Sequence, residues 1–114
     1  MSALSNSFSD PVSGLLEVTF SRGYEGQRYD LGGGAYINVR CKIVDGSGVV
    51  LAVGVMPGAG YVYPAEYASL TLTASYPGGS AVWGVAMEEA SHALGAPGYV
   101  KVFDLIATVK LFKR

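Results

Sequence analysis

Residues 36–56 read YINVRCKIVDGSGVVLAVGVM, and this stretch decides the fold class. In residues 36–44 apolar and polar side chains alternate, with Ile37, Val39, Cys41 and Ile43 on one face and Asn38, Arg40 and Lys42 on the other. A period of two predicts a β-strand with one face on a core and the other toward water or a partner. The glycines in residues 45–48, DGSG, suit the positive φ of a hairpin turn, so we expect the chain to fold back there.

The returning segment, residues 49–56, carries apolar side chains on both of its faces. A strand of this kind is either central in a sheet or lies at an edge that another chain covers. We expect a neighbouring subunit to cover this segment, with Val49, Leu51 and Val53 among the contact residues.

Further strands are predicted on both sides of this hairpin. Alternating or β-rich patterns place them at residues 15–20, 68–76, 80–87 and 99–112, and Asp104 marks a bend in the last of these. The glycine-rich residues 21–34 are predicted to be a loop with a short strand near residues 28–31, and residues 61–64 a short extended piece. Residues 88–94 favour a short helix because alanine, glutamate and leucine predominate, and Gly95 and Pro97 would end it.

The pattern as a whole predicts an all-β protein, an antiparallel sandwich or barrel of roughly six to eight short strands with at most one short helix. Residues 14–114 form a single domain in this interpretation. Residues 1–13, rich in serine, are predicted to be a flexible N-terminal arm. The arm either frays or becomes ordered on a neighbouring subunit, with Phe8 as its anchor.

Composition excludes several classes of protein. The chain has 114 residues, of which 50% are hydrophobic and 15% charged, so disorder over the whole length is not expected. A formal net charge of -1 argues against direct nucleic-acid binding. The longest apolar run, residues 49–56, is far shorter than the about 20 residues of a membrane helix, so we expect no membrane contact. One cysteine, Cys41, rules out a disulfide within the chain.

The residues that carry catalysis elsewhere are sparse here. His92 is the only histidine, and no Gly-x-Ser-x-Gly motif surrounds a serine. Glu88 and His92 would share a face of a helix, but two residues are too few to hold a metal. The glycines at residues 32–34 precede a predicted strand, whereas a phosphate site needs a helix N-terminus. We therefore predict a protein that is not an enzyme and that uses no metal or cofactor.

Aromatic residues offer one alternative function. Tyr61, Tyr63, Tyr67 and Trp83 could form a stacking platform for sugars, with Tyr61 and Tyr63 on one face of an extended segment. The same rings could instead seal the ends of a small core. A carbohydrate-binding sandwich that uses Tyr61 and Tyr63 is therefore the second candidate function.

A longer stretch carries a resemblance to a known class of proteins. Residues 26–86 run GQRYDLGGGAYINVRCKIVDGSGVVLAVGVMPGAGYVYPAEYASLTLTASYPGGSAVWGVA and contain the patterns I-x-V-R-x-x-I-V-D-x-x-G and G-x-x-Y-P-A-x-Y-x-S-L-T-L-T-A. In hydrophobic rhythm and turn placement this stretch resembles small β-sandwich virion proteins of bacteriophages, found as minor capsid, decoration or tail-associated subunits. The resemblance implies a structural subunit of a symmetric assembly without enzymatic activity, located in the virion. Outside a phage, we expect a cytoplasmic protein.

The expected partners are other protein subunits, and above all further copies of this chain. The chain combines high apolar content with few charges, which is more apolar surface than a monomer of this size readily hides.

Overall fold

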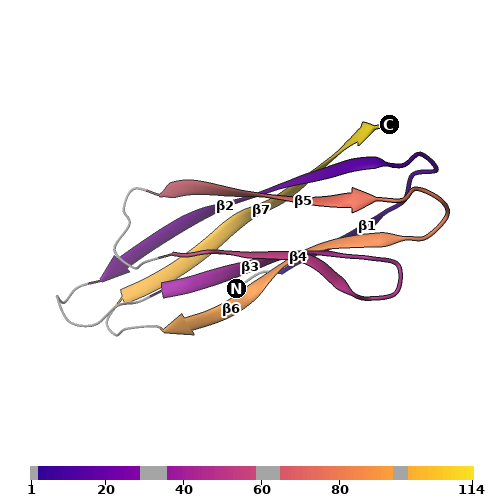
Figure 1. Ribbon diagram of the computed structural model, residues 1–114. Helices are drawn as coiled ribbons and strands as arrows, with labels where there is room; N and C mark the ends of the chain where they lie inside the picture. Colours follow the sequence, from indigo (N-terminus) through magenta and orange to yellow (C-terminus); the bar gives the residue numbers. More distant parts are fainter. Residues whose placement is uncertain (1–2, 29–35, 59–64, 94–97) are drawn as a thin grey trace.

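Seven strands make up the computed structural model, which describes residues 3–28, 36–58, 65–93 and 98–114 (Figure 1). None of these residues lies in a helix. In chain order the strands are β1 (Leu4–Phe8), β2 (Gly14–Arg28), β3 (Tyr36–Val44), β4 (Val50–Met56), β5 (Glu66–Tyr76), β6 (Trp83–Ala93) and β7 (Gly98–Lys113).

The strands form two antiparallel sheets that face each other, as the two layers of Figure 1 show. Sheet A has the order β1-β6-β3-β4, and sheet B has the order β5-β2-β7. Every neighbouring pair of strands runs antiparallel. The predicted all-β antiparallel sandwich is thus confirmed.

The core lies between the sheets and follows the predicted alternation. Val39, Cys41 and Ile43 on β3 face Val18 and Phe20 on β2, and all five are fully buried. Side chains at alternate positions of a strand point to one face, so these inward residues form a continuous apolar layer. Burial raises the pKa of the Cys41 thiol to about 11, which keeps it protonated and unreactive near neutral pH.

The N-terminal segment differs from the expected flexible arm. Residues Leu4–Phe8 form β1 and pair with β6, from Leu4 opposite Met87 to Phe8 opposite Trp83. Leu4 and Phe8 are separated by an even number of positions, so both side chains point toward the core in a strand and pack against it. The serines and Asn6 between them are exposed, which explains why composition alone suggested an arm.

The predicted loop at residues 21–34 is wrong over its first part. Strand β2 continues to Arg28 and pairs with β7 as far as Gly98. A glycine suits position 23 because the Phe103 ring fills the space that a side chain would need. A Cβ at this position would lie 2.5 Å from Cε2 of Phe103. The predicted short strand near residues 28–31 lies mostly outside the described residues.

The predicted short helix at residues 88–94 is also wrong. Residues 88–93 belong to β6 and pair with β3, for example His92 with Ile37. Pairing with a long strand overrides the weak helical preference of so short a segment. The bend predicted at Asp104 is confirmed, because Asp104 has a φ of 53° beside a register shift between Ser21 and Gly23.

One end of the sandwich is held by a close approach between two turns. Gly78, with a φ of 78°, lies against the segment that joins β1 to β2, and a Cβ there would be 2.7 Å from the carbonyl oxygen of Pro11. The next residue, Gly79, has a φ of 98° and open space around it, while its amide donates to the same oxygen at 3.3 Å. Gly78 is therefore required for space as well as for conformation.

We expect Gly78→Ala to lower the free energy of unfolding more than Gly79→Ala, its neighbour in the same turn. A positive φ alone costs an L-residue about 1 kcal/mol, which applies to both variants. Gly78→Ala adds a backbone clash that should cost about a further 1–3 kcal/mol. Urea unfolding of the two variants measures the difference, and equal losses would contradict the close approach.

Candidate interaction surface

In residues 51–55, strand β4 has its larger side chains on the outside and its smaller ones on the inside. Ala52 packs toward the core, and Gly54 lies so near β5 that a Cβ would be 2.7 Å from Cδ2 of Leu70. The outward residues Leu51, Val53 and Val55 are 44%, 56% and 47% exposed. This is the reverse of the usual arrangement, in which the core receives the larger apolar groups.

We call the exposed residues Val49, Leu51, Val53 and Val55 the β4 stripe. Val49, the residue just before β4, is 55% exposed and, with Val50 at 48%, extends the run of exposed apolar residues into the turn. No charged residue and no proline occurs in residues 49–56. Soluble proteins rarely leave a contiguous apolar row of this kind open to water, so the stripe is a candidate contact surface.

The backbone of β4 adds a second feature to this surface. β4 stands at the edge of sheet A, and among the described strands only β3 pairs with it. Natural edge strands are usually protected by charges, by prolines, by bulges or by being short. In β4 a register shift near Ile43 and Val44 disturbs only its first residues, and the rest of the strand has no such protection.

The other three edges of the sandwich differ from β4 in length, charge or side-chain polarity. β1 spans 5 residues. β7 contains Asp104 with its positive φ, and carries Lys101, Lys110 and Lys113. β5 begins with Glu66 and presents exposed hydroxyl side chains along its outer face: Ser69, Thr71, Thr73 and Ser75. β4 is therefore the edge strand that combines an exposed apolar row with the absence of any charged residue.

A cluster of charges lies beside the β4 stripe on the outer face of sheet A. Lys42 Nζ is 3.1 Å from Glu88 Oε1, and Arg40 Nη1 is 3.5 Å from the same oxygen. In the register of β3 and β4, Lys42 lies opposite Val53 and Arg40 opposite Val55. Two cations thus share one carboxylate next to the apolar row, which leaves the cluster with one net positive charge.

The pKa of Glu88 is lowered from its ordinary value by this arrangement. The hydrogen bond from Lys42 is the main cause. Burial comes second and acts in the opposite direction, while the charge of Lys42 and the hydrogen bond and charge of Arg40 lower the pKa further. Hydrogen bonds and positive charges favour the ionised carboxylate. The ion pairs therefore stabilise the fold at neutral pH, and this contribution is lost as the pH falls through the lowered pKa.

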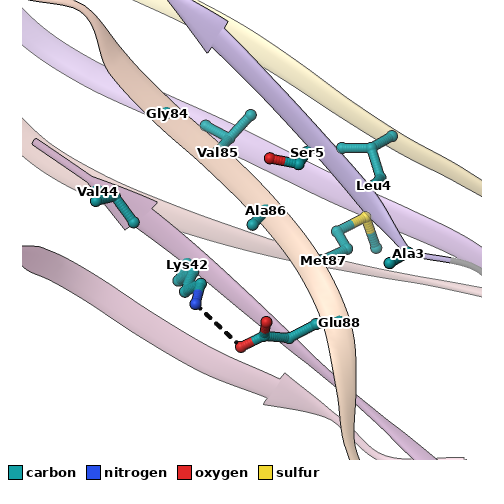
Figure 2. Close-up of a pocket in the computed structure, with 10 residues that line it drawn as sticks. All are labelled: Ala3, Leu4, Ser5, Lys42, Val44, Gly84, Val85, Ala86, Met87 and Glu88. Atoms are coloured by element: carbon teal, nitrogen blue, oxygen red, sulfur yellow. Dashed lines mark ion pairs between the residues drawn. The ribbon is translucent and has the colours of Figure 1, made fainter. Parts of the chain in front are cut away.

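A hollow of about 370 Å³ lies on the other side of this cluster, between β1 and β3 (Figure 2). Gly84 has no side chain and Ala86 has only a methyl group. The side chains of the neighbouring strands β1 and β3 therefore rise above β6 on both sides of the hollow. Figure 2 shows Ser5 of β1 on one side and the ion pair of Lys42 with Glu88 on the other. The outer face of sheet A consequently has a depression over β6, between β1 and β3.

The predicted contact residues fall partly on this surface. Val49, Leu51 and Val53 are all exposed on the β4 stripe. Tyr61 and Tyr63 lie outside the described residues. Trp83 is 5% exposed and packs edge-on against Tyr76 at 4.8 Å, so its ring is part of the core and not of a sugar platform. The carbohydrate-binding alternative stays a prediction that depends on Tyr61 and Tyr63.

Residues with catalytic potential are dispersed. Nδ1 of His92 contacts Oε1 of Glu89 at the exposed end of β6. In the part of the chain that the structure describes, no group of three or more His, Cys, Asp or Glu side chains is placed to hold a metal ion. The same residues include no helix long and apolar enough to cross a membrane.

Two parts of this surface were missed at the level of sequence. Val55 is exposed on the same face as the predicted contact residues Leu51 and Val53. Its spacing of two residues from Val53 is the sequence signal that places it on that face. The sequence pattern predicts a helix at Glu88, so its pairing with Arg40 and Lys42 across two strands was not foreseeable.

In comparisons with known proteins, no family model and no curated protein sequence matches the chain.

We expect Lys42→Met to raise the pKa of Glu88 more than Arg40→Met does, because the hydrogen bond from Lys42 is the largest cause of the lowering. Carboxyl-detected NMR titration measures the midpoint in each variant. Lys110→Met, a change on the opposite sheet, is the matched control and should leave the Glu88 midpoint where it is in the wild type. A wild-type midpoint no lower than that of the Lys42→Met/Arg40→Met double variant would refute the assignment.

Proposed function

We propose that this protein is a non-enzymatic structural subunit of a symmetric assembly, in which the β4 edge of one copy contacts the β4 edge of another. The observation that carries the proposal is the reversed side-chain pattern of β4. Large apolar residues point outward along a strand whose inward positions hold Ala52 and Gly54. Covering the outward row removes apolar area from water, which favours association.

The inward positions explain why the large residues cannot simply turn into the core. A shift of one position would direct Val53 toward Leu70, where even the Cβ of an alanine has little room. The close approach of β4 and β5 therefore favours the observed register of β4. In this register, a partner is the remaining way to cover the stripe.

A second copy suits this edge because an antiparallel pair of β4 strands is self-complementary. With a two-fold axis at Val53, Leu51 of one copy lies opposite the partner's Val55, and Val53 opposite the partner's Val53. β-branched and leucine side chains make favourable cross-strand pairs, and no charged residues of β4 oppose one another. The two copies of sheet A would then continue into one sheet.

The setting we propose for this assembly is a bacteriophage virion, as a minor capsid, decoration or tail-associated protein. The support for this setting is the resemblance of residues 26–86 to such subunits, together with an interaction surface that suits protein more than nucleic acid. The cations of sheet A beside the stripe, Arg40 and Lys42, are already paired with Glu88, so they form no open basic patch.

We expect Val53→Lys to lower the mass of the assembly in solution, because a lysine at the two-fold axis opposes an identical charge and breaks the apolar row. Light scattering coupled to size-exclusion chromatography measures the mass. Circular dichroism should still show a β protein, since Val53 lies outside the core.

Thr73→Lys is the matched control, because Thr73 is an exposed, outward residue on the neighbouring edge strand β5. This variant should keep the wild-type mass. The proposal fails if the wild type is a monomer at high concentration, or if Val53→Lys and the wild type have the same mass.

A further inference from the structure

A second cluster of side chains lies on the outer face of sheet B. Tyr67 of β5, Gly23 of β2 and Phe103 of β7 are directly opposed across the three strands of this sheet. Opposed residues point to the same face of a sheet. Because Arg22 and Tyr24, on either side of Gly23, are buried in the sandwich, the row points outward. It places two aromatic rings on the surface.

The two rings meet over β2 because Gly23 has no side chain. A Cβ at position 23 would lie 2.5 Å from Cε2 of Phe103, so this ring covers the glycine. The rings of Tyr67 and Phe103 meet edge to face, with centroids 5.9 Å apart and 81° between their planes. Such a pair holds its rings in a defined orientation. Tyr67 is still 67% exposed, more than any other large hydrophobic residue that the structure describes.

Two charged side chains of β7 lie beside the rings. The Tyr67 hydroxyl donates a hydrogen bond to Oδ2 of Asp104 at 3.3 Å, and Nζ of Lys101 lies 5.4 Å from the centre of the Phe103 ring. An ionised carboxylate accepts about four hydrogen bonds, and an ammonium group donates three. The bond from Tyr67 therefore leaves most of the acceptor capacity of Asp104 for a ligand.

A β-bulge brings the carboxylate of Asp104 to the rings. Ser21 is opposed to Ile106 and Gly23 to Phe103, so β7 has one residue more than β2 between these pairs. Asp104 takes up the extra residue with a φ of 53°, a conformation that is unfavourable for a residue other than glycine. Bulges redirect side chains, and they occur often beside functional sites.

We infer that Tyr67, Phe103, Lys101 and Asp104, which we call the Tyr67 site, bind one sugar of a neutral glycan chain. The exposed ring of Tyr67 suits the C–H groups on one face of a pyranose, because an aromatic face is apolar and electron-rich. The Asp104 carboxylate suits the sugar hydroxyls as hydrogen-bond donors, and the Lys101 ammonium suits the sugar oxygens as acceptors. Bonds to charged groups are the stronger kind.

Hydroxyl side chains continue the outer face of sheet B beyond the Tyr67 site. The next outward residues of β5 are Ser69 and Thr71, and Thr71 belongs to a row with Thr19 of β2 and Thr108 of β7. The hydroxyls of Thr19 and Thr71 are 3.2 Å apart. Hydroxyls both donate and accept hydrogen bonds, as those of a glycan do. Four residues of strand span about 13 Å, which is longer than one sugar ring, so a chain of several sugars suits this face.

Other classes of ligand suit the Tyr67 site less well. Single-stranded nucleic acid also stacks on aromatic rings, but it needs a positively charged groove. Here Glu25 is opposed to Lys101 in register, and Asp104 adds a second carboxylate. A protein partner would bury a core of apolar side chains, whereas hydroxyls predominate beyond the rings. Glycan binding goes beyond the proposed assembly and does not depend on the β4 contact.

Saturation-transfer difference NMR of the full chain tests the Tyr67 site, with maltohexaose, cellohexaose and chitohexaose as separate probes. The method observes the sugar, so it suits an assembly of any size. At least one probe should receive saturation, most strongly at the C–H protons of one ring face. Tyr67→Ala should raise the dissociation constant for that probe about tenfold or more, as expected for the loss of a stacking ring. Asp104→Asn should raise it less, because asparagine also tolerates a positive φ and keeps an oxygen acceptor.

Tyr36→Ala is the matched control, because Tyr36 is an exposed tyrosine at the start of β3 in the other sheet. This variant should bind the sugar as the wild type does. Tyr67→Ala should keep the wild-type mass, so loss of sugar binding and loss of the β4 contact are separate results. The inference is overturned if none of the three probes receives saturation, or if Tyr67→Ala binds with wild-type affinity. Should Tyr67→Ala fail to fold, wild-type affinity of Asp104→Asn overturns it instead.

Discussion

The rest of the structure depends on the close approach of β4 and β5 at one side of the sandwich. A Cβ at Gly54 would lie 2.7 Å from Cδ2 of Leu70, so a larger residue there would have to displace that side chain, and Ala52 is the other inward residue between Leu51 and Val55. Since strand side chains alternate, fixing these positions on the inside fixes Leu51, Val53 and Val55 on the outside. The exposed stripe is thus a direct consequence of how tightly the two sheets close.

The four edge strands of the sandwich differ in length, charge and polarity, and these differences bear on which edge can pair with another chain. β7 carries lysines and a residue with positive φ, which discourage pairing with another chain, whereas β4 carries neither. β1 is short and is anchored by Phe8. The β4 edge of sheet A is therefore suited to a contact between copies.

Much of the fold was predictable from local pattern, because a strand with one buried face has to alternate. Residues 36–44 gave β3 with its bounds and its inward face, and Asp104 correctly marked the bend in β7. The errors have a common cause. Residues 88–93 and 21–28 are strands because long neighbours pair with them, and no residue within either segment reveals that pairing.

The interaction surface was predictable to the same degree. Val49, Leu51 and Val53 followed from an apolar run without charges, since such a run needs cover on both faces. Which face would be left open depended on Leu70 of a strand distant in sequence, and the pairing of Glu88 with Lys42 depended on the register of β6. Contacts of this kind arise only when the sheets assemble.

The central claim is that another subunit covers β4, and hydrogen exchange of the backbone amides of residues 50–56 in the concentrated full-length protein tests it most directly. A covered edge strand has its outward amides bonded to a partner, so all of these amides should exchange as slowly as those of β3, and faster upon dilution. If every second amide of β4 instead exchanges rapidly at all concentrations, the edge is open to water and the account is wrong.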